Sequence, residues 1–217
     1  MISILIPTKE EPYINGLIKD INTKVKIKHE IIIIDKSLKK PSIKGAKLLI
    51  QKSDGLGNAV LEGIKEAKGD FVVMMDGDGS HDPIYINEMY RQIKKYDIVV
   101  GSKYMQGGST EDQGRRVIIS KSFNLLITSL LGIKMKDLMS GYAMFNRKIF
   151  DHIVLRPRGF KLLMEIVYKS KRPVKEIPVI FYKRKAGKSK VGYNFSGVKE
   201  AWRIFSLAWS LKFGGIR

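Results

Sequence analysis

Cysteine is absent from the chain, and this absence excludes a disulfide scaffold, a thiolate zinc site and a cysteine nucleophile. Histidine is scarce as well. The three histidines, His29, His81 and His152, are too scattered in the sequence to suggest a multi-histidine metal site. Cysteine and histidine chemistry therefore does not point to a function for this protein.

Long apolar runs are also missing. A membrane-spanning helix needs about 18 uncharged apolar residues, and charged side chains interrupt the two nearest candidates, residues 117–133 and 201–216. The apolar run at residues 1–7 is too short for the hydrophobic part of a signal peptide, and no basic stretch precedes it. We therefore expect a cytoplasmic protein that does not cross a bilayer.

Acidic residues are few compared with basic ones. The 217 residues include 40 Lys and Arg against 21 Asp and Glu, which gives a formal net charge of +19. Residues 151–217 alone hold 16 basic and 4 acidic side chains, so they are a candidate contact surface for phosphate groups, nucleic acid or acidic lipid headgroups. A solvated surface of biased composition is the alternative explanation. The 44% hydrophobic content excludes disorder and fits one medium-sized domain.

Apolar runs rich in β-branched residues alternate with helical patterns. Continuous runs, typical of strands buried on both faces, occupy residues 2–6, 30–34, 47–51, 71–75 and 98–101. Amphipathic helical patterns occupy residues 13–24, 57–67 and 84–95. Farther along, we expect helices at 114–131, 160–171 and 195–212, and strands at 142–145 and 174–182. This order predicts an α/β fold with a mainly parallel central sheet and helices on both faces.

Polar residues directly follow the predicted strands, and in open α/β sheets ligands bind outside those carboxyl ends. The strongest cluster is Asp76-Gly77-Asp78, where a glycine allows a tight turn between two carboxylates. Carboxylates at this spacing suit Mg²⁺ or Mn²⁺ that substrate phosphates also hold. A structural turn with Asp82 capping the next helix is the alternative, but the position after a buried strand favours a metal site.

Seven motifs along the chain occur in the order seen in one enzyme family. They are Pro7-Thr8 with Glu11; Asp35-x-Ser37; Gly55-Leu56-Gly57-x-Ala59 with Glu62-Gly63; Met75-Asp76-x-Asp78-x-x-His81; Val100-Gly101-Ser102-Lys103-Tyr104 with Gly107-Gly108; Asp137-x-x-Ser140-Gly141-Tyr142; and Arg184-x-x-Gly187-x-Ser189-Lys190. As an ordered set they resemble the inverting glycosyltransferases of the polyprenol-phosphate (dolichol-phosphate) mannose synthase type. The resemblance spans residues 4–192, and the set is far more specific than any single motif.

The resemblance implies a fold and a reaction. The fold would be the nucleotide-diphospho-sugar transferase fold, of glycosyltransferase A type, with a catalytic domain at residues 1–192 and an amphipathic helix at 193–217. The reaction would be a metal-dependent transfer, with inversion, of mannose from GDP-mannose to a polyprenyl or dolichyl monophosphate. Departures from the family pattern at Lys9 and Lys36 leave the donor nucleotide open. A UDP-glucose-dependent enzyme, or one of the same fold with another acceptor, is therefore the alternative.

The resemblance also implies roles for particular residues. The metal is expected at Asp76 and Asp78, with Ser80 at the next metal- or water-contacting position. The nucleotide sugar is expected at Pro7, Lys9, Glu11, Ile34, Asp35, Asp76, Gly77 and Asp78. The acceptor phosphate is expected at Lys103, Arg115, Arg116, Ser140, Arg184, Ser189 and Lys190. The residues expected to act in catalysis are Asp76, Asp78, Asp137 and Arg184.

Elementary electrostatics supports this chemistry. A departing diphosphate develops negative charge that a divalent cation neutralises. An acceptor phosphate is already an anion at neutral pH, so it needs positioning and positive charge rather than a strong base. For some of the carboxylates a structural role is the alternative to a role in the reaction. Glu11 suits a helix N-terminus, Asp137 suits a turn, and Glu165 can pair with Lys161 or Lys169 along a helix.

The last predicted helix bears on how a lipid acceptor would be reached. Its aromatic and apolar stripe consists of Phe195, Val198, Trp202, Phe205, Ala208 and Trp209, with cationic residues elsewhere. Tryptophan and cationic side chains favour the headgroup level of a membrane, whereas packing onto the sheet is the alternative. We expect peripheral association with the cytoplasmic face of a membrane, either directly or through a membrane-anchored partner.

The high positive charge also fits a protein of another class, a nucleic-acid-binding protein. Such a protein would interleave basic residues with stacking aromatics on one face, and it would have no use for Asp76 and Asp78. We therefore favour the enzyme and expect no nucleic-acid partner.

Overall fold

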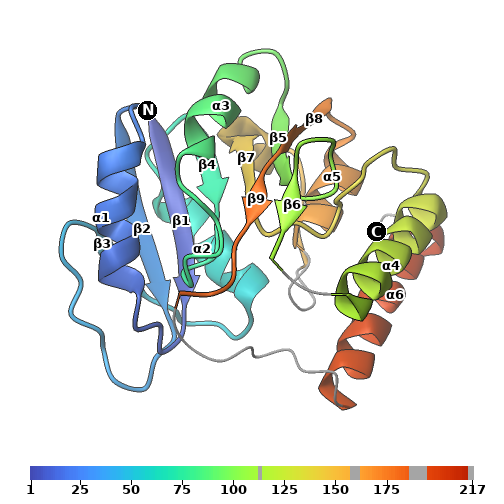
Figure 1. The fold of residues 1–217 in the computed structure, drawn as a ribbon, viewed down its shortest axis with the longest axis horizontal. Helices are drawn as coiled ribbons and strands as arrows, with labels where there is room; N and C mark the ends of the chain where they lie inside the picture. The colour runs from blue at the N-terminus through green and yellow to red at the C-terminus, as the bar shows by residue number, and fades with distance from the viewer. Residues whose placement is uncertain (112–113, 157–161, 186–194, 215–217) are drawn as a thin grey trace.

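A seven-stranded sheet forms the centre of the molecule (Figure 1). The computed structural model describes residues 1–111, 114–156, 162–185 and 195–214. In these residues the sheet has the order β3-β2-β1-β4-β7-β5-β8. Its strands are β1 (Ile2–Thr8), β2 (His29–Asp35), β3 (Lys47–Ile50), β4 (Phe71–Met74), β5 (Ile98–Ser102), β7 (Ala143–Asn146) and β8 (Val174–Pro178). Neighbouring strands run parallel except at β7, which is antiparallel to β4 and β5. The predicted mainly parallel sheet is confirmed.

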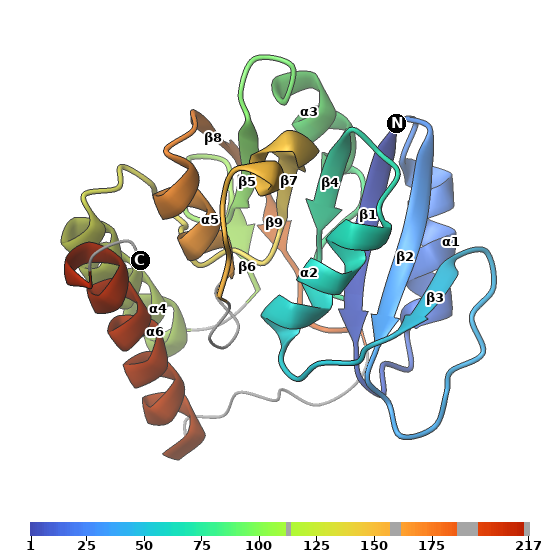
Figure 2. The ribbon, with the colours of Figure 1, turned by 180° about the vertical axis from the view of Figure 1, so that it is seen from behind.

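Helices cover both faces of this sheet, as predicted. α1 (Ile14–Lys24) and α3 (Tyr85–Gln92) cover one face, and α2 (Leu56–Glu66) and α5 (Leu162–Ser170) cover the other (Figures 1 and 2). The two longest helices, α4 (Arg115–Leu131) and α6 (Phe195–Phe213), lie against each other at one end of the molecule. α4 ends where Gly132 adopts the left-handed conformation that glycine favours at helix ends.

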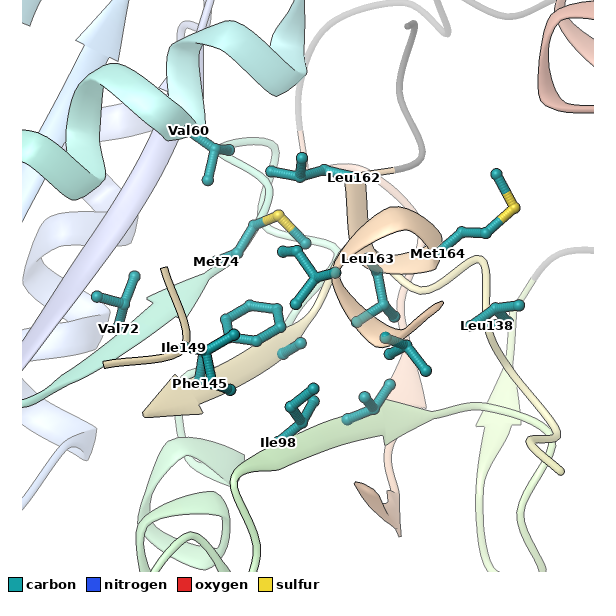
Figure 3. Close-up of a cluster of buried hydrophobic side chains, with 14 of the residues drawn as sticks. Val60, Val72, Met74, Ile98, Leu138, Phe145, Ile149, Leu162, Leu163 and Met164 are labelled. Carbon is teal, nitrogen blue, oxygen red and sulfur yellow. The ribbon is translucent and has the colours of Figure 1, made fainter. Parts of the chain in front are cut away.

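The central strands are buried on both faces because alternate side chains enter two separate cores. Ile4 and Ile33 point into the core under α1 and α3, whereas Leu5 and Ile32 point into the core under α2 and α5. Each of these four side chains is fully buried, which contributes about 1.5–3 kcal/mol apiece. Figure 3 shows the second core, where side chains of β4, β7 and α5 lie together. This packing explains why the strands read as continuous apolar runs rather than as alternating patterns.

Two strand predictions were wrong in detail. Residues 47–51 were expected to be buried on both faces, but β3 lies at the edge of the sheet, and Lys47 and Ile50 are exposed. The single strand expected at 174–182 is divided into β8 and β9 (Ile180–Phe181). After Pro178 the chain leaves β5 and pairs with the short strand β6 (Ser109–Thr110). An unpredicted 3-10 helix, η1 (Arg147–Asp151), follows β7.

The C-terminal helix packs on the core along one side and exposes the other, so its expected contact with a membrane stays a prediction. α6 packs against α4 and α5, and Ile204, Leu207 and Ala208 enter the core on that side. Ala208, expected on the same stripe as the tryptophans, is therefore on the buried side, while Trp202 and Trp209 are 68% and 52% exposed. Within the described part of the chain, no helix is both long enough and apolar enough to cross a bilayer.

Candidate active site

The candidate site lies between the carboxyl ends of β1 and β4. The chain leaves β1 toward β2 but leaves β4 in the opposite direction along the sheet, toward β5. Such a reversal opens a crevice at the ends of the two strands. A cavity of about 260 Å³ lies there and is lined by residues that follow both strands, including Lys9 and Asp76. The position predicted from the strand ends is therefore the position of the cavity.

Residues 76–82, which we call the carboxylate loop, contribute Asp76, Gly77, Asp78 and His81 to the lining of this cavity. Asp76 and Asp78 both line it, and their side chains are 39% and 6% exposed. Oδ1 of Asp78 accepts a hydrogen bond from the Ser80 amide at 3.0 Å, and Oδ2 lies 3.2 Å from Nε of Arg184. Asp78 is thus held on both oxygens, while Asp76 is more open to a ligand.

His81, a buried histidine within the carboxylate loop, lines the cavity and bonds to the backbone of the loop. Nδ1 of His81 accepts the backbone N–H of Asp76 at 3.1 Å, so in the neutral ring Nε2 carries the proton. The ring stacks on Tyr142 with centroids 4.8 Å apart, and the Tyr142 hydroxyl donates to the carbonyl of Asp82 at 2.9 Å. Burial lowers the pKa of His81 and raises the pKa of Tyr142 well above its ordinary value. Both rings therefore remain uncharged at neutral pH.

The opposite wall of the cavity comes from the segments that follow β5 and precede β7. Asp137 is buried, and its Oδ2 accepts the Lys103 amide at 3.3 Å. The Ser140 hydroxyl donates to the Gly101 carbonyl at 2.7 Å. Lys103 lines the cavity with its ammonium 4.8 Å from the centre of the Phe181 ring. This wall combines a carboxylate, a hydroxyl and a cation, which can orient a polar, anionic ligand.

On the β1 side, Asp35 holds the strand ends together. Its carboxylate accepts hydrogen bonds from the Thr8 hydroxyl at 2.8 Å and from both the amide and the hydroxyl of Ser37. Asp35 itself is 1% exposed, and it is Thr8 that lines the cavity. The role of Asp35 toward the nucleotide stays a prediction. Sequence reasoning missed Thr8, although Thr8 stands in the first quoted motif.

The structure brings most of the predicted site residues to one cavity. Those that line it are Pro7, Lys9, Glu11, Asp76, Gly77, Asp78, Lys103, Asp137, Ser140 and Arg184. Ile34, Asp35 and Ser80 are buried and do not line it. Arg115 and Arg116 begin α4, but the structure does not describe their side chains, and Ser189 and Lys190 lie outside the described residues. Unpredicted lining residues include Leu56, Met139, Val179 and Phe181, whose apolar side chains carried no chemical signal in the sequence.

The donor set fits a divalent cation of the Mg²⁺ or Mn²⁺ kind. No group of three or more acidic or histidine side chains suited to a metal occurs in the parts of the chain that the structure describes. Asp76 and Asp78 supply two carboxylates, the small number that these ions combine with water and phosphate oxygens. Space beside Asp76 depends on Gly141, because a Cβ there would lie 3.3 Å from Oδ2 of Asp76. The absence of a side chain at position 141 keeps this carboxylate open.

The chain is similar to known proteins over most of its length. Residues 3–154 match the family described as Glycosyl transferase family 2. A dolichol-phosphate mannosyltransferase of Pyrococcus furiosus is 32% identical over 208 residues, which cover 88% of this chain and 59% of that protein. A polyprenol monophosphomannose synthase of Mycolicibacterium smegmatis is 29% identical over 170 residues, which cover 73% of this chain and 63% of that protein. The chain thus spans about three fifths of the length of these relatives.

Solved structures share the fold. Glucosyl-3-phosphoglycerate synthase from Mycobacterium tuberculosis, in complex with Mn²⁺, UDP-glucose and phosphoglyceric acid, superposes with a TM-score of 0.70. The superposition covers 97% of this chain and 79% of that one, at 17% identity. The same enzyme with Mn²⁺, UDP and phosphoglyceric acid gives a TM-score of 0.73 at 19% identity, covering 100% of this chain and 79% of that one. These likenesses establish the glycosyltransferase A-type fold.

Proposed function

Because the chain belongs to glycosyl transferase family 2, we propose that it transfers mannose from GDP-mannose to a polyprenyl or dolichyl phosphate, with inversion and with the help of a divalent cation. The names of the sequence relatives support mannose as the sugar and a lipid-linked phosphate as the acceptor. The Mn²⁺ complexes of the structural neighbour support the cation. The observation that carries the proposal is the pairing of Asp76 and Asp78 with Lys103 and Arg184 around one cavity.

The carboxylate loop forms the donor side of the proposed reaction. Asp76 and Asp78 would hold Mg²⁺ or Mn²⁺ together with diphosphate oxygens of the donor, and Ser80 would support that contact. When bound, the cation supplies neutralisation of the charge that grows on the leaving diphosphate. Pro7, Lys9 and Glu11 line the same side of the cavity, where they would contact the nucleoside. Gly77 leaves room there, since a Cβ at this position would lie 2.9 Å from Cγ2 of Thr8.

The acceptor side supplies cations rather than a strong base. An oxygen of the acceptor phosphate attacks the anomeric carbon while the bond from that carbon to the diphosphate breaks. The bonding electrons leave with the nucleoside diphosphate, and the configuration at carbon inverts. Lys103 and Arg184 line the cavity and would neutralise the attacking and departing phosphates. Asp137, buried beside Lys103, would orient a sugar hydroxyl, and Ser140, Arg115, Arg116, Ser189 and Lys190 would complete the acceptor site.

The direct test is a product assay. The protein is incubated with GDP-mannose, Mg²⁺ or Mn²⁺ and dolichyl phosphate, and the lipid product is measured by mass. We expect a mannosyl phospholipid, and we expect Asp78→Asn to lower its rate about 100-fold because charge stabilisation of this kind has that weight. Asp70→Asn, at an exposed carboxylate beside the N-terminus, is the matched control and should keep the rate. Undiminished turnover after chelation, or full activity of Asp78→Asn, would contradict the proposal.

A specific observation keeps a second donor in view. The structural neighbour binds UDP-glucose, and this chain has Lys9 and Lys36 where it departs from the mannose-type pattern. The assay is therefore repeated with UDP-glucose. If only UDP-glucose gives a product, the transferred sugar is glucose rather than mannose, and the proposed roles of the carboxylates are unchanged.

We also propose that the protein reaches its acceptor by resting on an anionic lipid surface. The outer side of α4 is apolar, with Ile118, Ile119, Leu125 and Leu126 all 52–66% exposed. Its neighbour α6 carries a row of aromatic rings formed by Trp202, Phe205, Trp209 and Phe213, with successive centroids 4.5–6.1 Å apart. Phe205 is partly buried, and the other three are exposed. We call these residues together the α4–α6 face. Exposed apolar side chains gathered in this way mark an interaction site rather than an ordinary solvated surface.

Charge on the α4–α6 face favours a lipid surface as the partner. α4 contains no acidic residue, and Lys121 lies on its exposed side. On α6 the exposed cations are Lys199, Arg203 and Lys212, while the single acid, Glu200, is buried and 3.5 Å from Arg203. Cations beside tryptophan suit the headgroup level of an anionic bilayer. The Tyr104 hydroxyl bonds to Ser120 of α4, which ties this face to the segment that carries Lys103.

Vesicle binding tests the lipid surface. We expect the protein to sediment with phosphatidylglycerol-containing vesicles and not with pure phosphatidylcholine. Ile118→Ser with Trp209→Ser should weaken binding about tenfold, equivalent to about 1.4 kcal/mol, because both side chains would leave the apolar layer. Leu38→Ser is the matched control, since Leu38 is 96% exposed on the β2–β3 connection. This part of the proposal would be refuted if Leu38→Ser lost as much vesicle binding as the double variant. It would also be refuted if the protein bound equally well to phosphatidylglycerol-containing and pure phosphatidylcholine vesicles.

A further inference from the structure

A short segment after β8, which we call the strap, crosses over the carboxylate loop. The strap comprises residues 181–185. Phe181 forms an antiparallel bridge with His81, the Tyr182 amide donates to the Ser80 carbonyl at 3.0 Å, and the Lys185 amide donates to the Asp78 carbonyl at 3.0 Å. The strap therefore lies along the backbone of the loop that bears both candidate metal ligands, and it places Arg184 against Asp78.

The far end of the strap is attached to α1 by a cluster of three side chains, Lys185, Tyr13 and Asp20. The Lys185 ammonium donates to the Tyr13 hydroxyl at 2.7 Å and to Oδ2 of Asp20 at 3.0 Å, and it lies 4.6 Å from the centre of the Tyr13 ring. The Tyr13 hydroxyl in turn donates to Oδ2 of Asp20 at 2.6 Å. None of the three lines the catalytic cavity, so the reaction proposed above gives them no role.

The charges of this cluster are matched to one another. Burial raises the pKa of Asp20, but hydrogen bonds from Tyr13 and Lys185 outweigh burial and lower it below its usual value. Hydrogen bonds to Tyr13 and Asp20 raise the pKa of Lys185. Both groups are therefore ionised throughout the neutral range. Charge-assisted hydrogen bonds of this kind are stronger than neutral ones and fix geometry.

The same cluster packs directly on the turn of the carboxylate loop. Gly79 has a φ of +78°, and a Cβ at this position would lie 3.0 Å from the Tyr13 ring and 3.1 Å from Cδ of Lys185. The turn that follows Asp78 is thus pressed between the strap and α1. A shift of the Lys185 backbone would move the peptide that follows Asp78, because the Lys185 amide bonds to the Asp78 carbonyl.

We propose that Lys185, Tyr13 and Asp20 form a positioning cluster, which holds the strap and the carboxylate loop in the arrangement that binds the cation and the donor diphosphate. Arg184 and Lys185 are adjacent in the chain, and their side chains reach Asp78 and α1 respectively. Holding Lys185 in place therefore also holds Arg184 in place. The inference rests on the proposed function, because it takes the carboxylate loop as the donor site. None of the three residues touches the reacting atoms.

Calorimetric titration of the full chain with GDP, with and without Mn²⁺, tests the cluster. Lys185→Met keeps the packing on Gly79 but removes the ammonium, and we expect about tenfold weaker binding of GDP with Mn²⁺, the usual effect of losing a residue that orients a metal site. Lys185→Arg should restore most of the affinity because it keeps the charge. Lys183→Met is the matched control, since it removes the same charge from an exposed position on the same strap and should change affinity less than twofold.

Asp20→Asn separates positioning from simple electrostatics. Removing a negative charge should strengthen the binding of an anionic nucleotide if charge alone matters. The positioning role requires the opposite, weaker binding of GDP with Mn²⁺, and little further loss when Asp20→Asn is combined with Lys185→Met, since the two residues act as one unit.

The outcomes distinguish the inference from the proposed function. If the wild type binds neither GDP nor UDP with Mn²⁺, the donor site itself is wrong. If the wild type binds GDP with Mn²⁺ and Lys185→Met binds it equally well, the positioning cluster is refuted. It is also refuted if Lys185→Met loses no more affinity than Lys183→Met. Tighter GDP binding by Asp20→Asn would also refute it. Thermal unfolding of each variant is measured alongside, and Lys185→Arg keeps the test valid if Asp20→Asn does not fold.

Discussion

Replacing His81 should change both the stability of the protein and its dependence on pH. The imidazole is 3% exposed, accepts the Asp76 amide and stacks on Tyr142. In His81→Leu the Asp76 amide loses its acceptor, which costs about 1–3 kcal/mol, and the loss of ring stacking adds about 0.5–1.5 kcal/mol. We therefore expect His81→Leu to lower the free energy of unfolding by about 1.5–4.5 kcal/mol at pH 8.

His81→Asn separates these two contributions. The Asn Oδ1 lies where Nδ1 of histidine lies, so it can still accept the Asp76 amide while the stacked ring is lost. At pH 8 we expect His81→Asn to be more stable than His81→Leu by at least about 1 kcal/mol, the net worth of one hydrogen bond. Equal stability of the two variants would show that this hydrogen bond contributes nothing.

The pH dependence follows from the direction of the pKa shift. Burial lowers the pKa of His81 below its ordinary value of 6.5, and the charges of Asp76 and Asp78 offset burial only in part. Below pH 6.5 the unfolded chain binds a proton that the folded protein does not, so unfolding becomes easier. The stability that His81 contributes is therefore complete above pH 6.5 and falls as the pH drops toward the lowered pKa, by up to about 1.4 kcal/mol per pH unit.

Urea unfolding of the wild type and both variants between pH 5 and 8 measures this effect. Other groups titrate in all three proteins, so the informative quantity is the difference in unfolding free energy between wild type and variant. This difference should shrink as the pH falls from 6.5 to 5. A difference that stays constant across the range would refute the conclusion that His81 is buried in its neutral form.

Four further substitutions test local geometry. Gly69→Ala should lower the free energy of unfolding by about 3 kcal/mol in urea titrations, because its Cβ would lie 2.7 Å from the backbone of β1. Gly63→Ala should lower it less, because the Cβ there would contact only the ends of side chains. Gly141→Ala should leave the melting temperature unchanged but weaken Mn²⁺ binding in calorimetry about tenfold. Glu176→Gln, which loses one of two backbone amide contacts before β7, should destabilise by about 1 kcal/mol.

The parts of the site that follow strands could be predicted because two simple signals coincide there. A continuous apolar run indicates a strand buried on both faces, and the first polar residues after it must lie at the sheet edge. Asp76 and Asp78 satisfied both conditions, as did Lys9 and Lys103, and all four line the cavity. No long-range information was needed, since a parallel sheet collects its strand ends by itself.

Features that depend on which strands are neighbours could not be predicted in the same way. The run at 47–51 looks like the other apolar runs, but its exposure follows from its place at the edge, which the local pattern does not encode. The strap is another case, because residues 181–185 pair with a loop about a hundred positions earlier in the chain. The contact of Lys185 with Asp20 spans 165 positions, so no local spacing reveals it.

The direction of β7 explains why polar residues that follow predicted strands did not include those of the acceptor side of the site. β7 runs antiparallel between β4 and β5, and Ala143, its first residue, pairs with Met74 and with Val100 near the ends of those strands. Its amino end, not its carboxyl end, therefore lies at the active edge of the sheet. Asp137 and Ser140 line the cavity because they precede a strand, whereas the donor carboxylates follow one. Only the family resemblance indicated these two residues. The pattern of polar residues after strands did not, because β7 runs antiparallel and they come before it.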